Sequence, residues 1–264
     1  MISSVELAHR LDPVLMAEAA GYILDDWQQT LCRSKHPRIL LNIHRQGGKS
    51  LVCAIVALHT AMYEPGSPVL MVSPSLRQSS ELFRTALSIY RALDKPVAPE
   101  IENRLSLELE NNSRLISLPG SESTIRGLSG VRLIVADEAS RIPDTLLAAI
   151  RPFLAISNGR LIAPSTPAGR RGWWYEAWEH GGDTWERYQV KASECQRISR
   201  AFLDDERRAL GPNVYAREYE CSFDDDELSV FSEELIQRCI TKEQSSWAAK
   251  IPPPAWAQSS LSLV

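Results

Sequence analysis

Apolar and polar positions change period along the chain in a way that predicts strands and helices in turn. Short apolar runs lie at 38–43, 69–72, 131–136 and 160–163. Segments with apolar residues at helical spacing follow three of them, at 49–63, at 76–93 and around 144–151. Alternating strands and helices indicate an open α/β fold. Its central sheet is mainly parallel and flanked by helices, and its sites lie at the carboxyl ends of the strands.

One segment departs from this alternation. Residues 105–118, LSLELENNSRLISL, have period two on both sides of Asn111-Asn112, which predicts an antiparallel hairpin. The segment from Gly120 to Gly130 holds Arg126 and is expected to be flexible.

The pattern changes again after residue 169. Tryptophans cluster here, and the chain then predicts a strand in TWERYQV and two helices near 199–221. We therefore expect a core at 1–169, a small C-terminal lid subdomain at 170–225, and a linker or tail at 226–264. The clustered tryptophans are Trp173, Trp174, Trp178 and Trp185.

Composition excludes several classes of protein. The 264 residues are 44% hydrophobic and 23% charged, as in ordinary globular proteins, and no apolar stretch predicts a membrane span. The five cysteines lie far apart, which argues against a zinc site or a disulfide framework. The net charge of -4 excludes binding to nucleic acid by bulk charge. Contact with DNA then requires a local patch, or assembly as one subunit of a ring.

The segment 42–51, NIHRQGGKSL, ends like a phosphate-binding P-loop. The usual spacing G-x-x-x-x-G-K-[ST] requires glycine at position 43, where this chain has Ile43. The segment still follows a strand and opens a helix, so backbone N–H groups converge on a phosphate there. Gly47 and Gly48 permit close approach, Lys49 reaches the β and γ phosphates, and Ser50 can bind Mg²⁺. The alternative is a chance Gly-Lys-Ser at a helix start.

Two more strand ends carry chemistry. LIVADEAS, 133–140, ends a buried strand that we expect next to the loop strand. There Asp137 can hold Mg²⁺ and Glu138 can polarise an attacking water. APSTPAG, 163–169, ends the following strand, and Ser165-Thr166 can sense the γ-phosphate. The alternatives are an ordinary acidic strand end and an ordinary turn.

Together with DDWQQ at 25–29, the segments HRQGGKS, VADEAS and STPAG resemble the ATPase domain of a tailed-phage or prophage terminase large subunit. The resemblance covers roughly residues 20–235, and AREYECSFDDDELSVF at 216–231 is similar to the segment that leads into the linker. It implies a P-loop NTPase fold of the ASCE type, with ATP and Mg²⁺ as ligands. The implied function is ATP hydrolysis that powers translocation of double-stranded viral DNA into a capsid.

The resemblance also implies roles for single residues. Gln28 contacts adenine, Arg45 acts on the γ-phosphate or senses nucleotide, and Arg126 is offered across a subunit interface. Trp27-Gln28 as a packing pair and Arg126 as a surface arginine remain the alternatives. The implied catalytic residues are Glu138, Arg45 and Arg126, and the implied metal ligands are Ser50 and Asp137. The implied nucleotide-binding residues are Gln28, Arg45, Gln46, Gly47, Gly48, Lys49, Ser50, Ser165 and Thr166.

Arg170-Arg171 beside Trp173-Trp174 is open to two interpretations. Charge next to aromatic rings suits DNA binding through phosphate contacts and base stacking. We favour the other interpretation, in which the tryptophans pack the lid against the core.

The implied partners are double-stranded DNA, the portal protein, the small terminase subunit and further copies in a ring of five, in the host bacterial cytoplasm. An isolated domain is compatible with a monomer. Full-length terminases continue into an RNase H-like nuclease, so the tail at 226–264 is interpreted as a linker toward an absent nuclease domain, and no nuclease activity is expected. The alternatives are a helicase-like P-loop DNA translocase, a non-catalytic module that binds portal or small terminase, and a P-loop kinase.

Overall fold

In the computed structural model, residues 3–119 and 128–223 are described, and eight of their segments join in a sheet with the order β3-β4-β5-β2-β6-β7-β1-β8. The pairs from β5 to β8 are parallel, and the β3–β4 and β4–β5 pairs are antiparallel. The strands are β1 (Arg38–Ile43), β2 (Pro68–Ser73), β3 (Pro99–Glu102), β4 (Ser106–Leu109), β5 (Arg114–Pro119), β6 (Leu133–Ala136), β7 (Arg160–Ser165) and β8 (Glu186–Val190).

The predicted hairpin is confirmed, since β4 and β5 pair on either side of Asn111-Asn112. The predicted helices are confirmed as well. The α-helices are α1 (Ser4–Leu11), α2 (Pro13–Ala19), α3 (Asp26–Arg33), α4 (Lys49–Tyr63), α5 (Leu76–Ala92), α7 (Asp144–Ile150), α8 (Gly172–His180), α9 (Arg200–Leu210) and α10 (Pro212–Tyr219). Short 3-10 turns are η1 (Ala139–Arg141), η2 (Arg151–Leu154), η3 (Gly182–Thr184) and η4 (Ala192–Glu194). Within the described ranges no helix is both long and apolar enough to span a bilayer.

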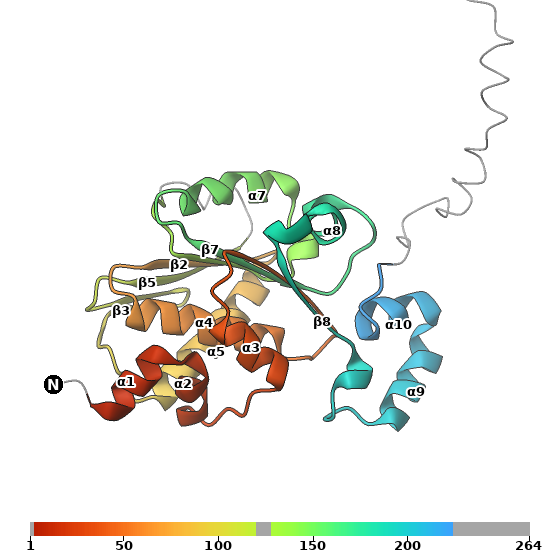
Figure 1. The fold of residues 1–264 in the computed structure, drawn as a ribbon, viewed down its shortest axis with the longest axis horizontal. Coiled ribbons are helices and arrows are strands. Elements are labelled where there is room, and N and C mark those ends of the chain that lie inside the picture. Colours follow the sequence, from red (N-terminus) through yellow and green to blue (C-terminus); the bar gives the residue numbers. More distant parts are fainter. Residues whose placement is uncertain (1–2, 120–127, 224–264) are drawn as a thin grey trace, which may run out of the picture. The chain divides into compact units, whose positions relative to one another are not determined.

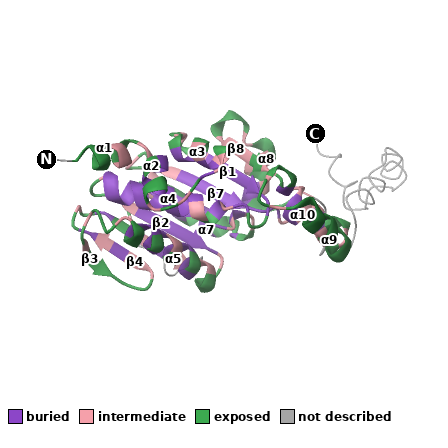
Figure 2. Ribbon diagram, turned by 90° about the horizontal axis from the view of Figure 1, so that it is seen from below, coloured by how far each residue is buried: buried purple, intermediate pink, exposed green. Residues whose placement is uncertain are grey.

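Helices cover both faces of the sheet, with α3, α4 and α5 on one side and α7 and α8 on the other (Figure 1). Successive side chains of a strand point to opposite faces, so the buried strand β1 serves two cores. Ile39, Leu41 and Ile43 join the core under α4 and α5, whereas Leu40 joins the core under α7 and α8. Figure 2 shows buried residues concentrated along these central strands.

The sequence predicts that the acidic strand, β6, lies next to the loop strand, β1. This prediction is wrong. β7 lies between them and pairs in parallel with β1 on one side and β6 on the other. A parallel strand needs a crossover connection, and the segment with α7 carries the chain from β6 back to the position beside β1. The end of β7 therefore separates Asp137 from the P-loop.

The region after residue 169 contributes to the same sheet. β8 pairs with β1 in parallel and forms an edge of the sheet. Trp173 and Trp174 are buried, and their indole N–H groups donate to the carbonyl oxygens of Ile142 and Ala163, both at 3.0 Å. The packing interpretation of these tryptophans is thus confirmed. Residues Met1–Asp224 form one compact unit, and the division of this unit at residue 169 stays a prediction.

Candidate functional site

The P-loop joins β1 to α4 and is shaped by two glycines. Gly48 has φ of +90°, and a Cβ there would lie 2.5 Å from Nε2 of Gln28. A Cβ on Gly47 would lie 2.6 Å from Cγ2 of Ile43. Ile43 is the last residue of β1 and is fully buried in the core, which explains why a side chain replaces the leading glycine. The loop accordingly needs glycine at 47 and 48 and an apolar residue at 43.

Gln28 supports the loop from α3. Its side chain is 2% exposed, its Oε1 accepts from the Asp25 N–H at 2.9 Å, and its Nε2 donates to the Gly48 carbonyl at 3.4 Å. Gln28 does not line the pocket described below. Its proposed contact with adenine stays a prediction, and its position shows a structural role in holding Gly48.

Lys49 is buried and folded back onto its own loop. Its Nζ donates to the carbonyl oxygens of Ile43 at 2.8 Å and His44 at 3.0 Å. Burial lowers the pKa of Lys49, with the nearby carboxylates Glu138 and Asp137 opposing that shift. Burial also raises the pKa of Asp137 to about 7, with the charge of Glu138 adding to the rise and Lys49 opposing it. The lysine thus faces two carboxylates across the end of the sheet.

A pocket of about 470 Å³ opens above the loop. This volume suits a small-molecule ligand. One wall is the P-loop and the start of α4, and Glu138 and Thr166 reach the pocket from the ends of β6 and β7. The pocket is lined by Arg45, Gln46, Gly47, Gly48, Lys49, Ser50, Leu51, Gln78, Glu138, Arg141, Thr166 and Glu218. Predicted residues from three separate motifs therefore meet in one place.

A hydroxyl network links the ends of β6 and β7. Ser165 is fully buried behind the pocket, and its Oγ accepts from the Ser140 N–H at 3.2 Å. The Ser140 and Ser165 hydroxyl oxygens are 2.7 Å apart, and each is 2.8 Å from the Thr166 carbonyl oxygen. A shift of Thr166 therefore changes its hydrogen bond to Ser140, which lies in the turn directly after Glu138.

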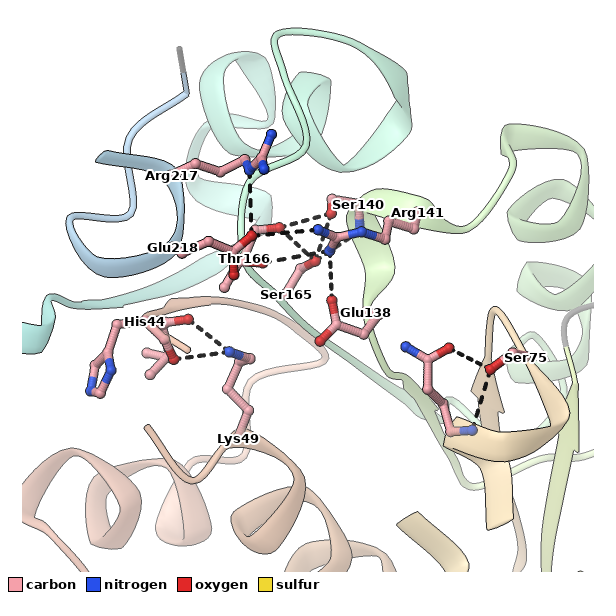
Figure 3. Close-up of polar contacts among 12 residues, drawn as sticks. His44, Lys49, Ser75, Glu138, Ser140, Arg141, Ser165, Thr166, Arg217 and Glu218 are labelled. Atoms are coloured by element: carbon pink, nitrogen blue, oxygen red, sulfur yellow. Dashed lines mark hydrogen bonds and ion pairs between the residues drawn. The ribbon is translucent and has the colours of Figure 1, made fainter. Parts of the chain in front are cut away.

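Two charged residues in the site were not predicted from the sequence. Arg141 Nη1 lies 2.7 Å from Glu138 Oε2 and 3.5 Å from Thr166 Oγ1, and Arg141 Nη2 lies 3.8 Å from Glu218 Oε1 (Figure 3). Glu218 comes from α10, far along the chain. The i,i+3 spacing of Glu138 and Arg141 is a sequence signal from which Arg141 could have been predicted. Nothing in the sequence near Glu218 marks it as a pocket residue.

A family comparison decides the identity. Residues 40–238 match the family described as "Terminase large subunit, T4likevirus-type, N-terminal". The chain belongs to this family. No curated protein matches the sequence. The predicted family, the N-terminal domain of a terminase large subunit, is thereby confirmed.

Solved terminase structures share the fold of this terminase domain. The ATPase domain of the Thermus phage P74-26 large terminase has a TM-score of 0.68 at 23% identity, over 78% of this chain and 96% of that one. The large terminase of bacteriophage D6E in complex with ADP gives 0.58 at 11% identity, over 79% of this chain and 52% of that one. The HK97 bacteriophage large terminase gives 0.57 at 18% identity, over 88% and 48%. The terminase chain thus spans about half the length of these two larger proteins.

The residues present fit a magnesium ion shared with a nucleotide. The described part of this terminase domain holds no cluster of three or more His, Cys, Asp or Glu side chains suited to a metal. Mg²⁺ commonly uses only one or two protein oxygens together with substrate phosphates and waters. The buried carboxylate of Asp137 and the exposed hydroxyl of Ser50 at the start of α4 supply that kind of donor set. Arg126 lies outside the described residues.

Proposed function

We propose that this terminase domain binds ATP with Mg²⁺ in the P-loop pocket, hydrolyses it, and uses the energy to move double-stranded DNA into a viral capsid. The observation that carries the proposal is the meeting of residues 45–50 with Glu138 and Thr166 around one pocket. These residues come from three strand ends, and a chance Gly-Lys-Ser at a helix start would have no reason to face the other two motifs.

Phosphate binding follows from the loop. The backbone N–H groups around Gly47 and Gly48 and the N-terminus of α4 favour an anion. Lys49 exchanges its two loop carbonyl acceptors for phosphate oxygens, and Arg45 and Gln46 line the same wall. Ser50 and Asp137 would hold Mg²⁺, which neutralises charge on the phosphates when bound.

Glu138 acts as the base for hydrolysis. Its carboxylate takes a proton from a water molecule while the water oxygen forms a bond to the γ-phosphorus. The bond from that phosphorus to the bridging oxygen breaks, and the oxygen leaves with its electron pair as part of ADP. Loss of phosphate next to Thr166 is passed through Ser165 and Ser140 to the rest of the domain.

Substitution of Glu138 by glutamine tests the base. Glu138→Gln keeps the size and the hydrogen-bonding ability of the side chain but cannot accept the proton. We expect ATP binding to persist and turnover to fall by at least about 100-fold, the usual contribution of a general base. Release of phosphate is the measurement, and turnover near that of the wild type would remove Glu138 from the mechanism. Absence of nucleotide binding in the wild type would refute the proposed function itself.

The partners belong to the proposal as well. We infer a ring, five subunits by family resemblance, that acts on DNA at the portal with the small terminase subunit in the host cytoplasm. The net charge of -4 supports DNA contact by an assembly rather than by one chain. Arg126 would complete the site of a neighbouring subunit, so Arg126→Ala should flatten the rise of ATPase rate with protein concentration and leave ATP affinity unchanged. An equal loss of affinity would place Arg126 in the site of its own subunit.

A further inference from the structure

Glu218 places a carboxylate in the wall of the pocket that we propose binds the phosphates of ATP. Its side chain is 11% exposed, and it lies near the end of α10, facing the P-loop. The other acid that lines the pocket, Glu138, has a role in hydrolysis. Glu218 has none, and a negative side chain beside a polyphosphate is electrostatically unfavourable. Its presence therefore calls for another role.

The partners of Glu218 lie on both sides of the pocket. Its Oε1 is 3.8 Å from Arg141 Nη2 and 3.4 Å from Arg217 Nε. Its carbonyl oxygen accepts from the Arg45 N–H at 2.8 Å. Arg141 is at the same time bonded to Glu138 at 2.7 Å. One arginine is thus shared between the base and α10, and α10 is also bonded to the P-loop.

We propose that Glu218 is a positioning residue that occupies Arg141 in place of the terminal phosphate of ATP. When ATP enters, the terminal phosphate takes the guanidinium from Glu218, because phosphate offers more charge and more acceptor oxygens than a carboxylate. Glu218 then faces the phosphate as a like charge, and α10 moves away from the P-loop. ADP lacks the terminal phosphate and leaves the Glu218–Arg141 pair in place. This inference rests on the proposed function.

The packing of α10 suits such a movement. Tyr215 and Tyr219 of α10 pack with Leu203 of α9 in a small apolar cluster that is separate from the two cores of the sheet. The two helices can therefore shift together with their own cluster intact, while Phe223, just beyond α10, stays packed on Trp174 in the core under α7 and α8. The backbone bond between Arg45 and Glu218 is one of the contacts that would break.

The charge of Glu218 is tested by Glu218→Gln in the full chain, with ATPγS and ADP as probes in the presence of Mg²⁺. The substitution keeps the shape of the side chain and the backbone bond to Arg45. We expect the Kd for ATPγS to fall about tenfold, equivalent to about 1.4 kcal/mol, and the Kd for ADP to change far less. Glu220→Gln is the matched control, since Glu220 follows α10 and pairs with Arg207 but does not line the pocket. It should leave both constants unchanged.

A double-mutant cycle separates positioning from a general structural effect. Arg141→Gln should weaken ATPγS binding more than ADP binding. In that background Glu218→Gln should tighten ATPγS less than it does in the wild-type background, because no guanidinium is left to release and only the like charge of Glu218 is removed. Calorimetric titration gives the constants, and thermal unfolding checks that each variant is folded. If Glu218→Gln does not fold, the Arg141→Gln variant provides the test. It should weaken ATPγS binding more than ADP binding, and equal weakening of both nucleotides overturns the proposal.

Two other results distinguish a failure of this inference from a failure of the proposed function. A wild type that binds ATPγS, with Glu218→Gln unchanged or weaker, overturns the role of Glu218 and leaves the proposed function standing. A wild type that binds neither nucleotide overturns the proposed function and this inference with it.

Discussion

The contact between Gly48 and Gln28 makes a quantitative prediction about the P-loop. Gly48→Ala forces a side chain into the left-handed conformation at φ of +90° and places its Cβ 2.5 Å from Gln28 Nε2. The conformation alone costs about 1 kcal/mol of folding free energy. Displacement of Gln28 also costs its bond to the Gly48 carbonyl and its cap bond to the Asp25 N–H, about 1 kcal/mol each. The expected loss is therefore about 3 kcal/mol.

Gly66 supplies the control for backbone strain. It has φ of +71°, and nothing lies within 4 Å of a Cβ built there, so Gly66→Ala carries the cost of conformation only. For a chain of this size, 1 kcal/mol corresponds to a change of about 3 °C in Tm. We expect Tm to fall by about 9 °C for Gly48→Ala and about 3 °C for Gly66→Ala, measured by circular dichroism.

Removal of Gln28 isolates the steric part. In a Gln28→Ala background, Gly48→Ala should cost no more than Gly66→Ala, because the clashing amide is gone. Equal losses for Gly48→Ala and Gly66→Ala in the wild-type background would refute the packing of Gln28 against the loop. ATP affinity should fall with Gly48→Ala but not with Gly66→Ala, since Gly48 lines the pocket and Gly66 does not.

Two further predictions concern the core. His59 is 9% exposed, its Nε2 lies 3.0 Å from the His9 carbonyl oxygen, and burial lowers its pKa to about 4. The unfolded chain takes up this proton near pH 6.5, so stability is full above that pH and should fall by up to about 3 kcal/mol toward pH 4. His59→Gln should flatten this part of the stability-against-pH curve in denaturant titrations, and an unaltered curve would contradict the assignment. Trp174→Ala removes a fully buried ring and its bond to Ala163, and should cost about 3–5 kcal/mol in the same titrations. A loss below about 1 kcal/mol would show that the ring is not part of the core.

The sequence was sufficient for the local parts of the site. Apolar runs followed by Gly-Lys-Ser, Asp-Glu and Ser-Thr identified three strand ends, because a buried parallel strand is apolar throughout and its carboxyl end carries the polar residues. The order of the strands was not accessible in the same way. Placement of β7 between β6 and β1 depends on packing between segments far apart in the chain.

Part of the pocket wall depends on contacts between distant segments and could not be predicted from the sequence. Glu218 meets Arg141 only because α10 folds back over the P-loop, and the local pattern around Glu218 is that of an ordinary amphipathic helix. The family resemblance predicts that Gln28 contacts adenine, and this stays a prediction. The structure adds that its buried amide is bonded to Gly48. The family motif identified the residue, and only the structure shows what it holds.

The P-loop has a consequence for biosynthesis. β1 is made early, yet its neighbours in the sheet, β7 and β8, are made more than 100 residues later. The loop also depends on late residues, since the His44 N–H donates to the Val190 carbonyl and the Asn42 side chain donates to the Cys221 carbonyl at 2.9 Å. A nascent chain on the ribosome therefore carries its phosphate-binding loop without the first support until residue 190 has emerged, and without the second until residue 221 has emerged. Such non-local pairing slows folding. A chain interrupted before residue 221 would lack the bond between Asn42 and Cys221.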